Sequence, residues 1–285
     1  MRGFWAALIL AILPGGPASA EESPWFLRGE ILGGANPAGL MASGGAFRRL
    51  PRGEAGVALG ASPAYGQASA QAEWTPWPVL KLAISGELYR FFGAHDALLS
   101  FPGADSAFGD RERDALSGRE EAGYGRRLLV QPTLRGRLRP FLLLNQTDWS
   151  QHRLSGRGPY FLELGYDTLV KSRDTVLANR SVILYVHREA SGRHLYYGPY
   201  FEFLRARGSR LERARLGGAL DLVFGSSRWP RSRPRFYLLT GLNLKDRNRR
   251  HQLFFAAGLS VEVQDRKSTR LNSSHIQKSR MPSSA

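Results

Sequence analysis

Residues 124–139 read YGRRLLVQPTLRGRLR, and this stretch shows most clearly how the chain folds. In an extended strand, one face here carries the apolar side chains of Leu128, Val130, Leu134 and Leu138. The other face is polar and rich in arginine, with Arg127, Gln131, Thr133, Arg135, Arg137 and Arg139. Because successive side chains of a strand point to opposite faces, this pattern predicts a β-strand with one apolar and one polar face.

The same period of two residues recurs through most of the chain. Residues 67–74 alternate polar and apolar side chains, and 253–263 place an apolar residue at every odd number. Outside the first twenty residues, no stretch shows a long helical apolar stripe, so the fold class we predict is all-β. We predict twelve strands, at 25–33, 54–61, 67–74, 79–92, 124–139, 141–149, 159–170, 175–189, 194–207, 211–224, 235–245 and 251–264.

Strands with two unlike faces occur in soluble sandwiches and in membrane barrels, and three features favour a membrane barrel. Several predicted strands reach the length of about 9–11 residues that a bilayer requires, whereas soluble strands usually have about five or six. Their polar faces repeatedly carry long charged side chains, as a wet lumen tolerates. Tryptophans stand at or beside predicted strand ends, where membrane proteins place aromatic belts: Trp25, Trp74, Trp77, Trp149 and Trp229. A soluble periplasmic β protein is the structural alternative.

The last predicted strand resembles the terminal strand of bacterial outer-membrane β-barrels. These proteins often end in an assembly signal of the form polar-x-Gly-x-x-apolar-x-apolar, and Gly258, Val261 and Val263 match its last three fixed positions. Ala256 replaces the polar residue, and Val263 stands where an aromatic is commoner. The resemblance is to porin-like barrels as a class. It implies a transmembrane antiparallel up-and-down barrel in the outer membrane, which meets the barrel-assembly machinery, outer-membrane lipid and lipopolysaccharide.

The strand count conflicts with the expected orientation of such a barrel. With the N-terminus in the periplasm, the twelve strands chosen above place the long connection 93–123 in the periplasm as well. Long loops normally face outward. A weak further strand at 38–48 would correct the orientation, but the total would then be thirteen. We keep twelve strands, within a range of ten to fourteen.

The two chain ends have a composition unlike the rest. Residues 1–20 resemble a cleaved secretory signal peptide, with Arg2, an apolar stretch too short to span a bilayer, and the small-x-small sequence Ala18-Ser19-Ala20. Residues 265–285 resemble a translated sequencing adapter, and we expect them to be a non-native, disordered tail. The expected barrel domain is therefore 21–264. Without Arg2 and without the five basic residues and the one aspartate of the tail, the formal charge falls from +16 to +11.

No catalytic motif has the required spacing. The sequence contains no Walker A loop, His-Glu-x-x-His or Gly-x-Ser-x-Gly. His152 and Ser155 invite comparison with a hydrolase pair, but no orienting partner is identifiable, and we interpret them as solvated loop residues. The acidic loop around 105–121 lacks calcium-site spacing and is interpreted as a solvated, mixed-charge segment. We expect no enzymatic activity, no metal, no cofactor and no nucleic-acid partner.

The polar strand faces supply the candidate functional residues. If they line the lumen, they include Arg127, Gln131, Arg135, Arg137, Arg139, Glu163, Asp167, Arg213, Arg215 and Asp221. A cationic wall would make the barrel a pore or transporter that passes small solutes, anionic ones among them, or an exported polymer. The alternative is a closed structural or surface-binding barrel, in which paired charges plug the lumen and nothing is transported.

Overall fold

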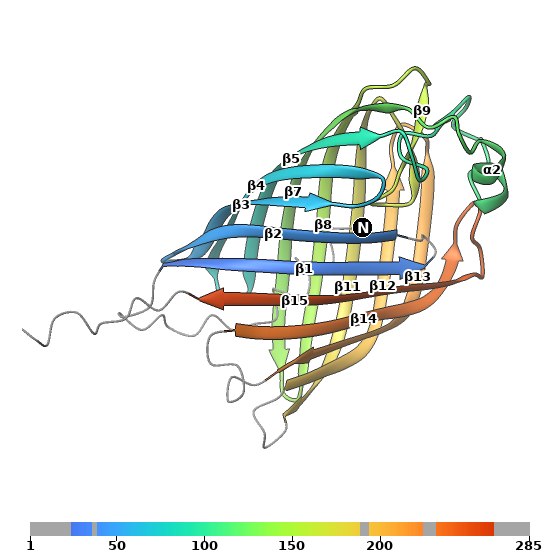
Figure 1. The fold of residues 1–285 in the computed structure, drawn as a ribbon. Coiled ribbons are helices and arrows are strands. Elements are labelled where there is room, and N and C mark those ends of the chain that lie inside the picture. The colour runs from blue at the N-terminus through green and yellow to red at the C-terminus, as the bar shows by residue number, and fades with distance from the viewer. Residues whose placement is uncertain (1–23, 36–38, 189–193, 225–231, 265–285) are drawn as a thin grey trace, which may run out of the picture.

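The computed structural model describes residues 24–35, 39–188, 194–224 and 232–264. These residues form a closed antiparallel barrel of twelve strands, as predicted from the sequence (Figure 1). The proposed signal peptide 1–20, the adapter-like tail 265–285 and Trp229 lie outside the described residues.

The barrel strands follow one another in chain order around the wall, except where two loops interrupt the numbering. The last strand pairs with the first, so that Phe26 lies opposite Gln264 and the sheet closes on itself. The strands are β1 (Trp25–Ala35), β2 (Gly39–Leu50), β3 (Gly53–Ala61), β4 (Tyr65–Trp77), β5 (Leu80–Phe92), β7 (Ala122–Leu138), β8 (Phe141–Leu154), β11 (Arg173–Arg188), β12 (His194–Ala206), β13 (Leu211–Val223), β14 (Ser232–Lys245) and β15 (Leu253–Gln264).

The predicted number of strands is correct, but two of the predicted segments were misjudged. The rejected stretch 38–48 forms β2, which pairs with both β1 and β3. The stretch 159–170 is not a wall strand. It turns back at Asp167, where φ is +48°, and forms two short strands, β9 (Tyr160–Glu163) and β10 (Thr168–Lys171). The two changes cancel in the count and remove the conflict over orientation, because 93–121 now joins the same end as the other long loop.

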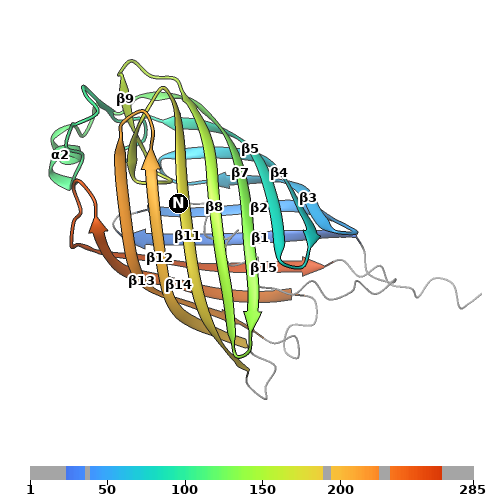
Figure 2. The same ribbon diagram turned by 180° about the vertical axis from the view of Figure 1, so that it is seen from behind.

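The two ends of the barrel differ in their connections (Figures 1 and 2). At the end where β1 begins and β15 ends, which we call the terminal end, β2–β3, β4–β5 and β7–β8 are joined by two-residue turns. The opposite end, which we call the loop end, carries the long segments 93–121 and 155–172. These segments include β6 (Ser100–Phe101) and α2 (Asp110–Ala115), and β6, β9 and β10 form a separate three-stranded sheet.

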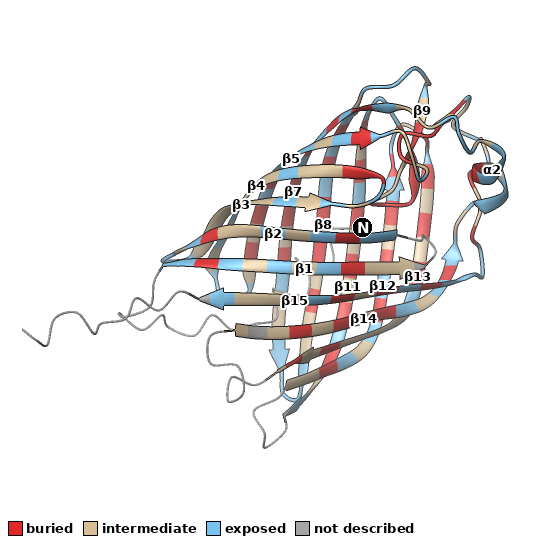
Figure 3. Cartoon of the chain, viewed as in Figure 1, coloured by how far each residue is buried: buried red, intermediate tan, exposed pale blue. Residues whose placement is uncertain are grey.

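The barrel wall alternates between an exposed apolar face and a buried inner face (Figure 3). On β15, Leu253 and Phe255 are exposed, whereas Phe254 and Ala256 between them are buried. A soluble sandwich buries its apolar face, but here that face is on the outside. A continuous apolar exterior on a sheet without edges is the arrangement that a lipid bilayer requires. The fold is therefore that of an outer-membrane β-barrel.

Aromatic side chains mark both ends of the exterior. Trp25, Trp74 and Trp77 are exposed at the terminal end. At the loop end, Phe92 and Tyr124 are exposed. Trp149 differs from the prediction, because β8 continues to Leu154 and the tryptophan lies within the strand. Among the described residues, no helix is long and apolar enough to cross a membrane.

Candidate functional site

The inside of the barrel is filled unequally, and this inequality defines the candidate site. The inner face of β8 and β11–β14, which we call the packed side, carries large apolar and charged side chains. The inner face of β1–β5, which we call the open side, carries small and uncharged polar side chains mainly at its centre. Toward the loop end its inner face is aromatic, because Tyr65 and Phe91 pack in a buried cluster with Leu98 and Phe161 of the loop segments. β7 and β15 lie between the two sides.

Ion pairs cross the interior on the packed side. Glu202 of β12 accepts hydrogen bonds from Arg180 of β11 at 2.7 Å and from Arg213 of β13 at 3.0 Å. Arg180 also donates to Asp148 of β8 at 3.1 Å, and Arg215 lies 3.6 Å from Glu202. Charges this deeply buried are tolerated only when they are paired and hydrogen-bonded. The network therefore ties four neighbouring strands together through their inner faces.

Further pairs and an apolar cluster complete the packed side. Arg235 donates to Asp221 at 2.6 and 2.7 Å. A buried apolar cluster lies on the inner faces of the packed-side strands and of β15, and it includes Leu184, Tyr200, Leu239 and Phe254. Tyr200 and Phe254 meet edge to face, with ring centroids 6.1 Å apart. Solutes would have no free volume among these side chains.

The loops close much of the loop end by folding into the barrel mouth. We call β6, β9, β10 and α2 with their connections the plug. Its apolar side chains, among them Phe101, Leu162 and Leu169, pack against wall residues such as Val176 and Leu204. This second apolar cluster occupies the mouth over the packed side.

One arginine of the β14–β15 connection anchors the plug. Arg249 donates to Asp167 at 2.9 Å and to Asp110 of α2 at 3.0 Å. Burial alone would raise the pKa of Asp110, but Arg249 and Arg113 outweigh it and hold that pKa below its ordinary value. Burial works against the charge of Arg249, yet Asp167 and Asp110 raise its pKa. Both partners therefore stay ionised across the physiological range, and the anchor persists there.

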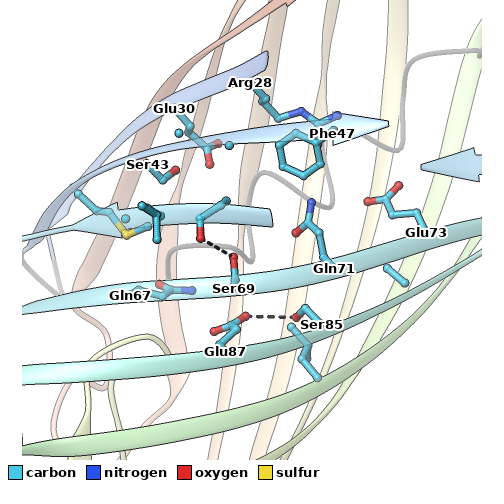
Figure 4. Close-up of a pocket in the computed structure, with 18 of the residues that line it drawn as sticks. Arg28, Glu30, Ser43, Phe47, Gln67, Ser69, Gln71, Glu73, Ser85 and Glu87 are labelled. Carbon is cyan, nitrogen blue, oxygen red and sulfur yellow. Dashed lines mark hydrogen bonds between the residues drawn. The ribbon is translucent and has the colours of Figure 1, made fainter. Parts of the chain in front are cut away.

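The open side contains a cavity of about 90 Å³, shown in Figure 4. Its lining includes the small or polar residues Ser43, Gly45, Ala58, Gly60, Gln67, Ser69 and Gln71. These side chains are too short to reach across the lumen, so the space that aromatic rings fill on the packed side stays free here. The hydroxyl of Ser69 donates to the carbonyl oxygen of Ala58 at 3.4 Å and is otherwise directed at the cavity (Figure 4).

Charged residues border this cavity toward the terminal end and toward β7. Arg28 forms an ion pair with Glu54 at 2.9 Å, and Lys81 forms one with Glu73 at 2.8 Å. Glu87 accepts from Arg127 at 2.6 Å. Each of these cations therefore has a carboxylate partner, and the cavity wall is polar but not cationic overall.

A second opening lies above the cavity, at the loop end of the same side. It holds about 780 Å³ between the ends of β1 and β2 and the segment 93–120. Four acidic residues line it together with Arg113: Asp96, Asp110, Asp114 and Glu120. Leu32 and Tyr237 lie at its floor, and the Tyr237 hydroxyl donates to Glu30 of the cavity below at 2.8 Å. This hydrogen bond joins the lining of the opening to the lining of the cavity.

The candidate residues from the sequence fall into three places. Arg127, Gln131, Arg213, Arg215 and Asp221 are buried inside the barrel, and of these only Gln131 lines the cavity. Glu163 and Asp167 belong to the plug, not to the wall. Arg135 is partly buried near the terminal end and donates to the carbonyl oxygen of Pro78 at 2.8 Å, whereas Arg137 and Arg139 are exposed there. The arrangement therefore contains no continuous arginine wall along the cavity.

Several interior residues were missed by the sequence analysis. Arg180 and Glu202 lie on polar strand faces that the alternation identified, but their partnership depends on which residues face each other across strands. Arg28, Glu30, Glu54 and Glu73 lie on β1, β3 and β4, whose inner faces the analysis did not single out. Their signal was present as charged residues two apart in extended segments.

The interpretation of His152 and Ser155 as solvated loop residues holds for the exposed Ser155 but is wrong for His152, which is buried within β8 because that strand continues to Leu154. His152 lies 2.9 Å from Ser150, through Nε2 and Oγ, and both side chains are buried. Ser155 instead bonds the backbone of Tyr124, which it contacts at 2.7 and 2.9 Å. In the part of the chain that the structure describes, no three His, Asp or Glu residues gather as a metal site would require. The terminal-strand residues Gly258, Val261 and Val263 lie on β15, and their role in assembly stays a prediction.

The sequence matches no family model, and no curated protein is detectably similar to it. Solved structures do share the fold. The β domain of the Bordetella autotransporter BrkA aligns with a TM-score of 0.48 at 14% identity, over 85% of this chain and 99% of that one. The KdgM porin in complex with disordered oligogalacturonate aligns with a TM-score of 0.42 at 8% identity, over 84% of this chain and 98% of that one. LpxR from Salmonella typhimurium aligns with a TM-score of 0.43 at 6% identity, over 82% of this chain and 99% of that one.

Proposed function

We propose that this protein is a narrow outer-membrane pore in which small polar solutes pass along the open side of the barrel. The observation that carries the proposal is the polar cavity of about 90 Å³ beside β1–β5, with a second opening at the loop end of the same side. A barrel that served only as a closed scaffold would gain stability by filling this space with larger side chains.

The solutes favoured by this geometry differ from those suggested by the arginine-rich sequence. The arginines of the packed side are committed to carboxylates, and the charged residues that line the outer opening are mainly acidic. We therefore propose that neutral or cationic polar solutes pass more readily than anions, since lumen charge sets selectivity.

Single-channel recording in planar bilayers tests the proposal. We expect a small conductance in the wild type. Ser69→Trp places a large ring in the cavity and should abolish most of that conductance. Ala70→Trp is the matched control, because the neighbouring side chain points outward and is exposed. Equal conductance in both variants would contradict a path along the open side.

The second candidate function is a closed barrel that acts through its surface. The plug and the paired interior charges favour it, because they obstruct the lumen at the loop end and on the packed side. Absence of conductance in the wild type, and equally in a variant with residues 157–171 replaced by a short Gly-Ser linker, would establish this candidate over the pore. We assign Ser150 and His152 a structural role in both cases.

A further inference from the structure

A row of arginines crosses the outer surface of the barrel near the loop end. Arg126 of β7 lies directly opposite Arg153 of β8, and Arg153 lies directly opposite Arg173 of β11. Their chain neighbours Arg127, His152 and Asp174 are buried inside, so all three arginines point outward, and all three are exposed. Arg207 extends the row, because its backbone N–H donates to the carbonyl oxygen of Thr175 at 2.9 Å. We call these four residues the arginine row.

Without a bound anion, such a row of like charges destabilises the sheet. Side chains directly opposite each other on neighbouring strands stand about 5 Å apart, and like charges in that position are destabilising. Within the described residues, none of the four arginines forms an ion pair, although most arginines of the interior do. The row therefore has the geometry of a site whose counter-ion comes from outside the chain.

A cationic cleft of about 1340 Å³ adjoins the row at the loop end. Lys171 and Arg210 line it together with three arginines of the row. It also contains two carboxylates, but both have partners. Asp174 accepts from the backbone N–H groups of Lys171, Thr175 and Gly208 at 2.7–3.0 Å, and Asp105 lies 3.2 Å from Arg247. The cleft keeps a net positive charge.

One more donor in this cleft has no partner. Ser209 is fully buried, lines the cleft, and its hydroxyl makes no hydrogen bond in the part of the chain that the structure describes. Buried hydroxyls are nearly always hydrogen-bonded. Because this hydroxyl is enclosed, it adds no donor to those that the open cleft presents, and the cations alone carry the attraction for an anion.

An apolar surface begins directly beside the row, on the side toward the terminal end. Leu128 follows Arg126 by two residues along β7, and Trp149 and Leu177 stand four residues from Arg153 and Arg173. All three side chains are outward and exposed. A ligand that lay against the row and this surface would need an anionic group joined to apolar chains.

From these observations we propose that the arginine row and its cleft bind the phosphate groups of an anionic lipid in the leaflet at the loop end, with its acyl chains against Leu128, Trp149 and Leu177. Guanidinium groups match phosphate oxygens with two parallel hydrogen bonds, and such charge-assisted bonds are among the strongest in proteins. This lipid site lies on the outer wall and does not depend on whether the barrel conducts.

Native mass spectrometry of the purified full chain in detergent tests the site. The probes are a diphosphorylated lipid A, a phosphate-free glycolipid with the same acyl chains, and inorganic phosphate. The row variant is R126Q/R153Q/R173Q. The control is R52Q/R137Q/R139Q, which removes three exposed arginines at the terminal end and changes the net charge equally. We expect the row variant to bind diphosphorylated lipid A roughly tenfold more weakly or worse, and the control to bind as the wild type does.

Unchanged binding by the row variant, equal loss in the control, or equal binding of the phosphate-free glycolipid would each overturn the proposal. Competition by inorganic phosphate at the concentration of the lipid would overturn the assignment to a lipid. Thermal unfolding in lipid-free, phosphate-free detergent gives a second measurement. Because the row variant removes like-charge repulsion, it should unfold at the same or a higher temperature than the wild type, and added lipid should raise the unfolding temperature of the wild type only. A row variant that is less stable than the wild type without lipid would contradict the repulsion.

Discussion

The open side and the packed side are built from the same kind of strand, yet they do different things with their inner faces. Along β8 and β11–β14, inward positions carry Arg180, Glu202, Tyr200 and other large side chains that meet between neighbouring strands of the wall. Along β2–β4, the central inward positions carry Ser, Gly, Ala and Gln, which leave a cavity. The comparison indicates that one half of the wall supplies the cohesion of the interior, and the other half supplies its free space.

The largest effect should come from removing the central carboxylate of the packed side. Glu202→Ala leaves Arg180, Arg213 and Arg215 without their shared partner, and a buried pair broken in this way costs about 3–5 kcal/mol. On the open side, Glu54→Ala should cost less than about 1 kcal/mol, because the pair lies nearer solvent and Arg28 keeps Glu262 at 3.6 Å. Denaturant unfolding in lipid vesicles measures the free energy of unfolding of both variants. Equal losses would show that the two sides do not differ in their contribution to stability.

Changing the volume of a side chain should again destabilise the protein more on the packed side than on the open side. Leu239 is fully buried in the packed cluster, and Leu239→Ala should lower the free energy of unfolding by about 3 kcal/mol through the cavity it leaves. Ser69→Leu adds volume where space is free, so its effect should stay within about 1 kcal/mol of zero. A loss for Ser69→Leu as large as that for Leu239→Ala would mean that the cavity is smaller than the structure shows.

The anchor of the plug should give a more local effect. Arg249→Gln leaves Asp167 buried without its cation, a penalty of about 1–3 kcal/mol. We expect faster amide hydrogen exchange in 160–171, with exchange in β11–β13 unchanged, because the plug opens while the barrel stays closed. Uniform acceleration over the barrel would show that the anchor stabilises the wall and not only the plug.

The smallest predicted effect is a dependence on acid. The pKa of Asp110 lies below its ordinary value of 3.8 in the folded chain, so its ion pairs stabilise the plug fully above that value and lose their effect as the pH falls through the lowered pKa. Conductance should therefore stay constant from neutral pH to about pH 4 and rise below it. In Arg249→Gln, this rise in conductance at acid pH should be much smaller. An unchanged rise would show that a group other than Asp110 causes it.

The fold could be predicted from the sequence because the period of two survives in almost every wall strand. The errors have physical reasons. β2 carries Ala42, Gly44 and Gly45 at its centre, so its faces differ little in hydrophobicity, and only pairing with β1 and β3 stabilises it as a strand. The stretch 159–170 is apolar because it is buried inside the mouth, and sequence alone does not distinguish that burial from a membrane-facing strand.

The candidate site was less predictable for a different reason. Arg213, Arg215 and Asp221 could be placed on an inner face, but whether an arginine lines a pore or pairs with a carboxylate depends on the residue opposite. Glu202 lies directly across from Arg215, a relation set by the register of two strands. The cavity was equally hidden, since it arises from small residues on three neighbouring strands, and their free space depends on which side chains the rest of the barrel places opposite them.

The pairing of β1 with β15 has a consequence for how the barrel can form. Each strand of the wall is hydrogen-bonded on both sides, and the second partner of β1 is β15, at the other end of the described sequence. A chain lacking β15 would present two unpaired strand edges to the hydrocarbon, where each unsatisfied backbone group costs several kcal/mol. Insertion and closure should therefore be a single cooperative event. A chain without β15 would be expected to remain outside the bilayer and to be degraded by proteases rather than insert as a smaller barrel.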